Sequence, residues 1–379
     1  MKLIVDENIV FAKEAFSSLG NIQLVDGRTL TNNDVKDADV LVVRSITNVN
    51  EELLKDSNVR FVGTATIGTD HIDLQYLRKH NITFADAKGC NADSVAEYVF
   101  TSLMKVASGK NISLKGRTIG VVGIGNIGSR VVRFAESLGM KVFKNDPPLQ
   151  RSGIGNNYVG FEEILKADVI TFHVPLNMEG VDKTFHLLNK NNLQKINNGT
   201  IIINSSRGAV IDNEALLSVT EEKDFNLILD VWENEPSINK DLLLKTKVAT
   251  PHIAGYSFEG KVNGTTMIYN ALSKFLNIRP LWQPNLPEIE NRSLRLPKDK
   301  TDEERLYNLF SSIYKIENDD DLMRKITKCE LSQQAKYFDM MRKKYPVRRE
   351  FNNYIVQISE EVFRLKKILE NFRFKVEIV

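Results

Sequence analysis

The chain of 379 residues contains only two cysteines, Cys90 and Cys329, and neither stands in a CxxC or other metal-type spacing. Neither a disulfide framework nor a metal site is therefore expected. No apolar run approaches the ~18 residues of a membrane span, and the acid Asp6 interrupts the first apolar stretch before a signal-peptide core could form. These absences predict a cytoplasmic protein that does not enter a membrane.

The sequence also lacks an excess of charge of either sign. Lys and Arg together number 51 and Asp and Glu 49, which gives a formal net charge of +2. This balance cannot supply the strong field with which proteins bind nucleic acid or anionic membranes. We expect no nucleic-acid partner, and we expect any anionic ligand to be held by a local site.

Glycine is absent from the C-terminal part of the chain, because all 21 glycines lie at or before Gly264. The tight turns that glycine permits are therefore confined to the earlier part. The stretch after residue 290 is more densely charged, and a proline-punctuated segment, 279–297, precedes it like a linker. We predict a separate C-terminal α+β domain over 286–379, with an amphipathic helix over 360–369.

Short β-branched runs alternate with helical patterns, which is typical of βαβ units and parallel sheets. The candidate strands are Lys2–Asp6, Ile22–Val25, Val40–Arg44, Arg60–Ala65, Ile82–Asp86, Thr118–Gly123, Lys141–Asn145, Val169–Val174, Thr200–Asn204, Leu227–Val231 and Val248–Thr250. These are too many for one open sheet of ordinary size. The chain is therefore expected to be α/β, with two doubly wound, Rossmann-like domains.

A long helix is predicted between the two doubly wound domains. Ser94 and Glu97 form a capping-box pattern, and the helix should run from there to about Ala107. The first domain is accordingly placed at 1–93, completed by about 257–285, and the second at 94–256.

Residues 118–128 read as a buried strand that runs into a G-x-G-x-x-G loop, with helical periodicity after it. Gly123 would allow the tight turn, Gly125 would let a pyrophosphate approach the backbone, and Gly128 would let the helix pack closely on the strand. A tight turn that binds nothing is the alternative. Because strand, loop and helix come in the required order, we expect a dinucleotide with its phosphates at the helix amino end, contacting also Asn126 and Ile127.

Asp146 ends the next strand, where an acid that bonds the adenosine ribose hydroxyls is expected. Its charge would repel a 2′-phosphate, so NAD is favoured over NADP. A simple turn acid before two prolines is the alternative interpretation.

Arg207, Glu235 and His252 each follow one of three successive predicted strands. They should therefore lie at strand carboxyl ends, where open α/β sheets bind ligands. Hydride transfer from an alcohol needs a base for the hydroxyl proton and a cation for the forming carbonyl and the substrate carboxylate. His252 is one of only five histidines, and by itself it would more often be a surface or core imidazole. With Glu235 to raise its pKa and fix its tautomer, and Arg207 to orient substrate, it is a candidate base.

Over about residues 1–285 these motifs together resemble the D-isomer-specific 2-hydroxyacid dehydrogenases. The resemblance implies that His252 accepts the hydroxyl proton, Glu235 supports the histidine and Arg207 binds the substrate carboxylate. It also implies contacts to NAD and to substrate. The implied NAD contacts beyond the glycine loop are Asp146, Val174, Ser205, Ser206, Arg207, Asp230 and Gly255, and the implied substrate contacts are Ser45, Thr66 and Tyr256. Val174 stands where the family has a small or hydroxylated residue, so it can offer only a backbone or apolar contact.

Within the family, the segments 5–8, 43–50 and 255–256 are similar to the members that oxidise 4-phospho-D-erythronate in vitamin B6 synthesis. The tail from Phe338 to Glu350 is similar to the C-terminal dimerisation domain of those members. The resemblance therefore implies a small phosphorylated 2-hydroxy acid as substrate and a homodimer as the assembly.

Three arginines are candidates for the substrate phosphate. Arg44, at a strand end, could equally form a structural ion pair. Arg348 and Arg349 could reach the phosphate if the tail covers a cleft, and a solvated charged face is the alternative.

Two other functions are compatible with the same motifs. A 3-phosphoglycerate dehydrogenase would use identical chemistry, although its glycine-bearing regulatory modules do not match the glycine-free tail. An NAD-sensing corepressor would bind protein partners and turn over little substrate. Turnover of a phosphorylated hydroxy acid separates the enzyme from the corepressor.

Overall fold

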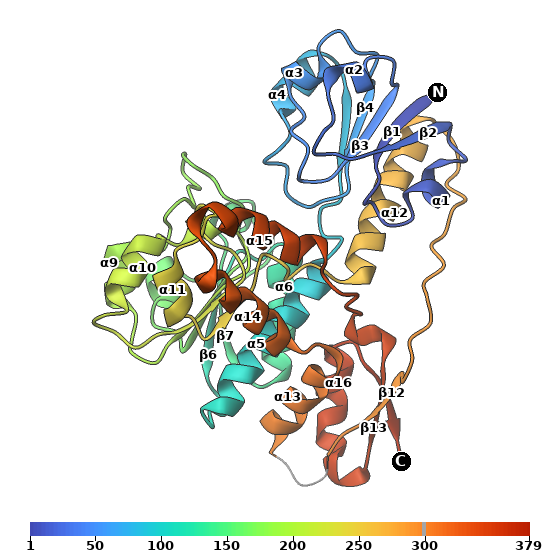
Figure 1. Ribbon diagram of the computed structural model, residues 1–379. Coiled ribbons are helices and arrows are strands. Elements are labelled where there is room, and N and C mark those ends of the chain that lie inside the picture. The colour runs from blue at the N-terminus through green and yellow to red at the C-terminus, as the bar shows by residue number, and fades with distance from the viewer. Residues whose placement is uncertain (298–300) are drawn as a thin grey trace. The chain divides into compact units, whose positions relative to one another are not determined.

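The computed structural model describes residues 1–297 and 301–379, which pack into two compact units (Figure 1). Unit 1 comprises Met1–Asn91 and Ser257–Glu288, and unit 2 comprises Ala92–Tyr256 and Ile289–Val379. Both are built on parallel sheets, so the predicted α/β class is confirmed. Among the described residues, the helices are all too short or too polar to cross a membrane, and neither cysteine is part of a disulfide.

Unit 1 holds a five-stranded sheet in the order β2-β1-β3-β4-β5. Its strands are β1 (Lys2–Asp6), β2 (Asn21–Val25), β3 (Val40–Val43), β4 (Phe61–Thr64) and β5 (Thr83–Asp86). The helices between them are α1 (Ala12–Phe16), α2 (Asn32–Val35), α3 (Glu51–Leu54) and α4 (Leu74–Lys79). Every residue of β3 and β4 is buried, as expected for central parallel strands that are covered on both faces.

A helix from much later in the chain, α12 (Phe258–Phe275), completes unit 1. Its N-cap Ser257 accepts a hydrogen bond from the Gly260 amide at 2.8 Å. The helix packs against β4 at Gly63, where an added Cβ would lie 2.5 Å from Ile268 Cγ2. The missing side chain of Gly63 is therefore what allows α12 to approach the sheet this closely.

Unit 2 holds a six-stranded sheet in the order β11-β10-β9-β8-β6-β7. Its strands are β6 (Thr118–Val122), β7 (Lys141–Asn145), β8 (Val169–Phe172), β9 (Ile201–Asn204), β10 (Asn226–Leu229) and β11 (Val248–Ala249). Its helices are α5 (Ala92–Gly109), α6 (Asn126–Ser137), α7 (Pro147–Arg151), α8 (Phe161–Ile164), α9 (Lys190–Lys195), α10 (Asn213–Val219) and α11 (Lys240–Lys245). The strand order reverses beside β6, which is the position where doubly wound sheets bind ligands.

The predicted start of the long helix is wrong. Helix α5 begins at Ala92, so Ser94 and Glu97 lie inside it and form no capping box. The Ser94 hydroxyl instead donates to the Ala254 carbonyl at 3.0 Å, and the Glu97 carboxylate accepts from the Phe351 amide at 3.0 Å. Both polar side chains serve tertiary contacts that sequence spacing cannot reveal.

The C-terminal segment, here residues 289–379, adds a three-stranded parallel sheet in the order β12-β13-β14. Its elements are β12 (Ser293–Arg295), α13 (Asp302–Ile313), α14 (Ile316–Arg324), α15 (Leu331–Lys343), β13 (Ile355–Ile358), α16 (Lys366–Asn371) and β14 (Lys375–Ile378). One amphipathic helix over 360–369 was the expectation, and it is wrong. A 3-10 helix over Glu360–Leu365 precedes α16, and Val362 has non-helical angles (φ −109°, ψ 18°).

The C-terminal segment shares its hydrophobic core with helices α5 and α6. Phe372 stacks on Phe134 of α6 with ring centroids 4.3 Å apart, and meets Phe100 of α5 edge to face at 5.3 Å. It also lies 5.1 Å from Phe310 of α13. The segment therefore packs with the second doubly wound sheet as part of unit 2 (Figure 1).

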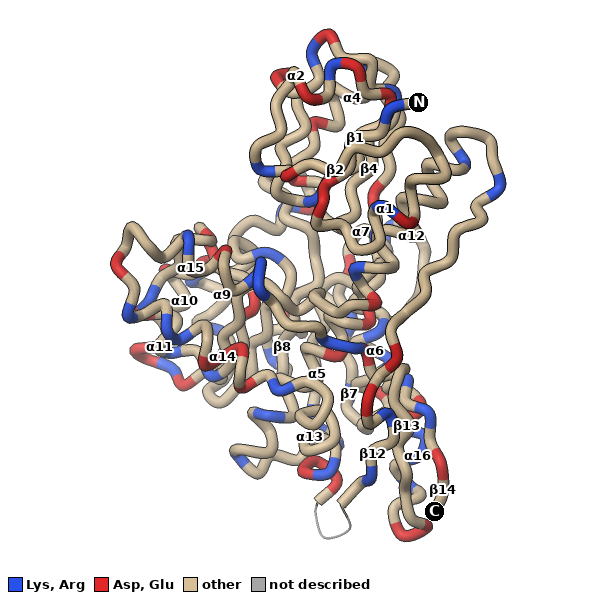
Figure 2. The backbone as a smooth tube through the Cα atoms, turned by 45° about the vertical axis from the view of Figure 1, so that its right-hand side comes forward, with Lys and Arg blue, Asp and Glu red and all other residues tan. Residues whose placement is uncertain are grey.

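Acidic and basic residues are interspersed along the backbone of both units (Figure 2). Many form short-range pairs across neighbouring elements, such as Arg117 with Asp168 at 3.0 Å and Arg364 with Asp302 at 2.8 Å. This interspersed pattern agrees with the balanced composition.

Candidate active site

The loop after β6 has a separate structural role for each of its three glycines. Gly123 has φ of +87°, and an added Cβ would lie 2.5 Å from the His173 carbonyl oxygen. At Gly128 a Cβ would lie 1.8 Å from the Gly123 carbonyl oxygen, so α6 could not pack on this loop with any larger residue. At Gly125 a Cβ would have no protein atom within 4 Å. The open space thus lies at the amino end of α6, which begins at Asn126.

Asp146 contacts this glycine loop directly. Its carboxylate accepts from the Ile124 amide at 2.7 Å and, as the N-cap of α7, from the Leu149 amide at 3.0 Å. The side chain is thus a turn acid that also lies beside the loop. This position is consistent with the predicted ribose contact, which stays a prediction.

Val174 borders the same loop, because a Cβ on Gly123 would lie 2.8 Å from Val174 Cγ1. The preceding His173 is half-buried, and desolvation of its ring lowers its pKa to about 3. Its Nε2 contacts the Thr171 hydroxyl at 2.9 Å. His173 is therefore a neutral structural imidazole with no capacity to exchange protons near neutral pH.

Glu235 and His252 form a hydrogen-bonded pair between Oε1 and Nδ1. The second carboxylate oxygen of Glu235 accepts from the Trp232 amide at 3.1 Å. Burial opposes ionisation of Glu235, but the charge of His252 and these hydrogen bonds outweigh it, so the pKa of Glu235 lies below its usual value. An ionised carboxylate on Nδ1 fixes the ring and leaves Nε2 for proton transfer.

The loop that carries His252 is held by Asp230 at the end of β10. His252 has φ of +57°, a left-handed conformation that is uncommon for a residue other than glycine. The buried Asp230 carboxylate accepts from the Thr250 hydroxyl at 2.6 Å and from the amides of Ile253 and Ala254 at 2.8 and 3.0 Å. These bonds stabilise the turn, and the cofactor contact implied for Asp230 stays a prediction.

Arg207 lies in a turn that packs against the Glu235 loop. The Asn204 side chain organises the turn by accepting from the Ser206 amide and hydroxyl and by donating to the Arg207 carbonyl, at 2.9 to 3.1 Å. At Gly208 an added Cβ would lie 2.0 Å from the Trp232 carbonyl carbon. The Arg207 turn is thus packed closely against the segment that follows β10 and leads to Glu235. Ser205 is buried in the same turn.

The structure adds one residue, Arg342 of α15, to those that the sequence indicated. Tyr256, four residues after His252 and next to Gly255, accepts a hydrogen bond from Arg342 Nε of α15 at 3.2 Å. The guanidinium lies 5.7 Å from the centre of the Tyr256 ring, and Tyr345 meets the same ring edge to face at 5.7 Å. Only tertiary structure brings α15 to this place, so no local signal could have revealed it.

The predicted substrate residues of unit 1 lie at one edge of its sheet. Ser45 follows the end of β3 and is exposed, and Thr66 follows the end of the neighbouring β4. The Thr66 hydroxyl contacts the Thr64 hydroxyl at 2.7 Å. Arg44 Nε lies 3.2 Å from the buried carboxylate of Asp6, so the structural ion pair considered for it is present.

The two arginines of the tail have different surroundings. Arg348 is only 6% exposed, contacts the Ser94 hydroxyl and the Ala254 carbonyl, and lies 4.4 Å from the centre of the Tyr314 ring. The alternative of a solvated face is therefore wrong for Arg348. Arg349 is half-buried, with Nη2 3.4 Å from Asn353 Oδ1. Phosphate binding by either residue stays a prediction.

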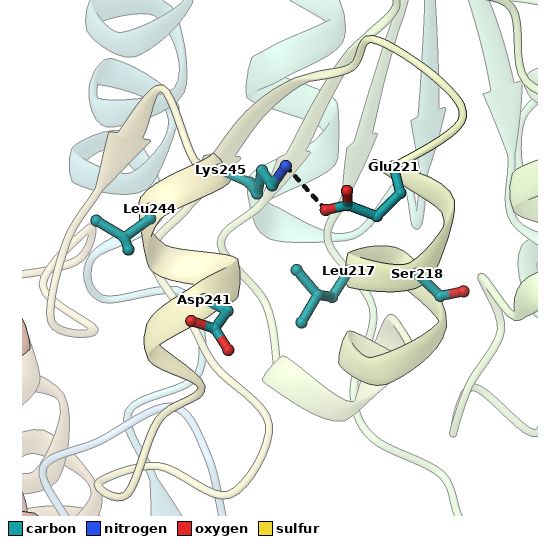
Figure 3. Close-up of a pocket in the computed structure, with 6 residues that line it drawn as sticks. All are labelled: Leu217, Ser218, Glu221, Asp241, Leu244 and Lys245. Atoms are coloured by element: carbon teal, nitrogen blue, oxygen red, sulfur yellow. Dashed lines mark ion pairs between the residues drawn. The ribbon is translucent and has the colours of Figure 1, made fainter.

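A hollow between α10 and α11 contains none of the predicted site residues (Figure 3). It is lined by Leu217, Ser218, Glu221, Asp241, Leu244 and Lys245. The ion pair between Lys245 and Glu221, at 2.8 Å, crosses one end of it.

His186, Asp212 and Glu233 form a titratable group in unit 2. His186 Nε2 lies 2.7 Å from Glu233 and Nδ1 lies 3.5 Å from Asp212. The imidazole thus lies between the two carboxylates and is hydrogen-bonded to Glu233.

Comparison with known proteins relates the glycine loop and the catalytic candidates Arg207, Glu235 and His252 to a family. Residues 91–254 match the model of the D-isomer specific 2-hydroxyacid dehydrogenase NAD binding domain, and residues 285–369 match a domain of unknown function. The chain is 42% identical over 369 residues to the erythronate-4-phosphate dehydrogenase of Cronobacter sakazakii, covering 95% of each chain. It is 43% identical over 357 residues to that of Shewanella halifaxensis, covering 93% of each.

The chain belongs to the D-isomer specific 2-hydroxyacid dehydrogenase family. Among solved members, the NAD-bound 3-phosphoglycerate dehydrogenase of Entamoeba histolytica is 26% identical, with a TM-score of 0.63, and covers 73% of this chain and 95% of its own. The D-lactate dehydrogenase of Aquifex aeolicus, complexed with NAD and lactic acid, is also 26% identical, with a TM-score of 0.58. The match covers 73% of this chain and 96% of the D-lactate dehydrogenase chain. The predicted family and its cofactor NAD are confirmed. The open space at Gly125, at the amino end of α6, fits the NAD phosphates.

Proposed function

We propose that the chain oxidises 4-phospho-D-erythronate at C2 with NAD, giving (R)-3-hydroxy-2-oxo-4-phosphobutanoate for pyridoxal phosphate synthesis. The observation that carries the reaction type is the hydrogen-bonded pair of Glu235 and His252 beside the Arg207 turn. The choice of substrate is supported by similarity to erythronate-4-phosphate dehydrogenases along almost the whole chain, C-terminal segment included.

In this mechanism NAD, when bound, supplies the hydride acceptor for C2. His252 Nε2 accepts the proton of the C2 hydroxyl, and the oxygen becomes the carbonyl oxygen of the product. The Glu235 carboxylate stabilises the imidazolium that forms and holds its ring in place. Arg207 binds the substrate carboxylate and stabilises negative charge on the C2 oxygen as its proton leaves.

The test is NADH formation by the purified protein with 4-phospho-D-erythronate, 3-phospho-D-glycerate and D-erythronate in parallel. A 2-oxo acid is added to reoxidise any retained cofactor. We expect a strong preference for 4-phospho-D-erythronate. Preference for 3-phospho-D-glycerate would assign the chain to serine synthesis, and no turnover of any substrate would favour an NAD-sensing binding protein.

Asp146 is proposed to set the preference for NAD. In Asp146→Ser the hydroxyl can still cap the Leu149 amide, but the charge is lost. We expect NAD to bind about 10-fold more weakly and the ratio of kcat/KM for NAD over NADP to fall, because a charged ribose ligand and the repulsion of a 2′-phosphate are both removed.

The control for this variant is Asp241→Ser, on α11 before β11, which is the strand at the opposite edge of the sheet from β7. The cofactor ratio of the control should match that of the wild type. An unchanged ratio in Asp146→Ser would remove Asp146 from the cofactor site.

We also propose that the chain forms a homodimer through the C-terminal segment. Supporting this, Leu331, Val347 and Phe363 are large apolar side chains of this segment that are more than half exposed, and β12 and β14 are edge strands of their sheet. Light scattering should give about twice the chain mass of 43.0 kDa, and a mass of one chain would exclude the dimer.

A further inference from the structure

Arg342 of the C-terminal segment lies close to the proposed catalytic pair. Its Nε donates to the hydroxyl of Tyr256 at 3.2 Å, and its guanidinium lies 5.7 Å from the centre of that ring. Tyr256 belongs to the short segment that begins with His252. The side chain of Arg342 is half-buried, so a helix far along the sequence contributes a partly desolvated cation to this neighbourhood.

The charge of Arg342 has no ion-pair partner among the described residues. Other arginines of the segment do have one: Arg324 pairs with Asp320 at 2.9 Å, and Arg373 pairs with Glu350 at 2.9 Å. The carboxylates of Glu235 and Asp339 attract Arg342 electrostatically without forming an ion pair with it, and the Glu235 carboxylate is itself hydrogen-bonded to His252. A half-buried guanidinium without a carboxylate partner is a ready site for an anionic ligand.

The proposed substrate carries two anionic groups on a short chain. Its phosphate at C4 is only two carbons from C2, where His252 is proposed to act, so the residue that binds the phosphate must lie near His252. Arg207 is assigned to the carboxylate at the other end. Each arginine suggested by the sequence has a protein contact of its own. Arg44 pairs with Asp6, Arg348 is buried against Ser94 and Tyr314, and Arg349 contacts Asn353.

We infer that Arg342 is a specificity-determining residue that binds the C4 phosphate of the substrate. This inference rests on the proposed function. Tyr256 holds Nε, which fixes the plane of the guanidinium and leaves both Nη groups to donate in parallel to two phosphate oxygens. The C-terminal segment would in this way contribute directly to the choice of a phosphorylated substrate.

The experiment compares steady-state oxidation of 4-phospho-D-erythronate and of D-erythronate by the full-length protein and by Arg342→Met. We expect kcat/KM for the phosphorylated substrate to fall about 100-fold, since a charge-assisted double hydrogen bond is lost. For the unphosphorylated substrate the change should be less than about threefold. The preference for phosphate should therefore collapse, and Arg342→Lys, which keeps the charge without the planar fork, should restore part of it.

The matched control is Arg364→Met, in the same segment, where an exposed arginine pairs with Asp302. It should keep the wild-type substrate preference. Inhibition by inorganic phosphate provides a second measurement, which also decides the case if D-erythronate turns over too slowly: Arg342→Met should weaken it at least 10-fold and Arg364→Met should not.

The inference would be overturned if Arg342→Met kept the wild-type ratio of kcat/KM for 4-phospho-D-erythronate over D-erythronate, including the case in which both values fall equally. The residue would then not distinguish the phosphate. Unaltered phosphate inhibition would overturn it as well. If Arg342→Met does not fold, as judged by circular dichroism and NADH binding, the same criteria apply to Arg342→Lys. Failure of the proposed function is seen separately, as absence of a preference for 4-phospho-D-erythronate in the wild type.

Discussion

Replacing His252 by Asn is expected to lower kcat for oxidation by about 10² to 10⁴, the usual contribution of a positioned general base. Asn tolerates the left-handed φ of +57° found at this position, so the turn held by Asp230 should survive. NAD binding should also survive, because the glycine loop follows a different strand. A steady-state assay of NADH formation measures the loss of kcat, and a fluorescence titration with NADH measures cofactor binding separately.

The pH dependence should follow the same residue. Oxidation needs a neutral imidazole at His252, so its rate should fall as pH decreases, whereas reduction of the oxo acid needs the imidazolium and should fall as pH increases. Glu235 should remain ionised over the pH range in which the imidazole changes its protonation, since the pKa of Glu235 is held below its usual value. The acidic limb of the oxidation profile should therefore be missing in His252→Asn.

His80→Asn is the matched control, because His80 is an exposed histidine stacked on Tyr76 of unit 1. It should leave kcat and the pH profile unchanged. If His252→Asn kept a rate within tenfold of the wild type, His252 would not be the base.

Replacing Phe372 by Ala should have the largest effect on stability. The ring is fully buried and contacts Phe100, Phe134 and Phe310. Its removal should cost about 3 to 5 kcal/mol of the free energy of unfolding, through lost burial and the cavity left behind. Because the cavity adjoins α5 and α6, NADH binding should be lost at the same lower denaturant concentration as the structure of the C-terminal segment.

The control for this variant is Lys367→Ala, in α16 of the same segment, where the side chain is exposed. Its free energy of unfolding should change by less than about 0.5 kcal/mol. Loss of the C-terminal segment at low urea, with NADH binding retained to the wild-type midpoint, would contradict the shared core.

The strands could be predicted because parallel strands buried on both faces appear as short β-branched runs. All eleven predicted runs are strands in the structure, and most end within one or two residues of the expected position, as β8 does at Phe172 instead of Val174. The glycine loop was predictable for a related reason. Gly123 and Gly128 each meet a steric demand that no other residue satisfies, and such demands leave a fixed spacing in the sequence.

The errors share a physical cause, namely tertiary contacts over long sequence separations. Ser94 has the spacing of a helix cap, but the helix already begins at Ala92, and the Ser94 hydroxyl donates to the Ala254 carbonyl. Arg342 could not be chosen from the many charged residues of the tail, because only folding brings it to Tyr256. The alternative of a solvated face failed for Arg348 for the same reason, because tertiary contacts bury this side chain.

The dependence of unit 1 on α12 has a consequence for biosynthesis. The first five strands leave the ribosome well before Phe258–Phe275 is made, and during that interval the face of β4 that receives Ile268 has no cover. The first doubly wound domain therefore cannot finish folding before the second one has been translated. Chaperones that shield apolar surfaces should consequently engage the nascent chain between these two points, and the incomplete sheet should be its most aggregation-prone intermediate.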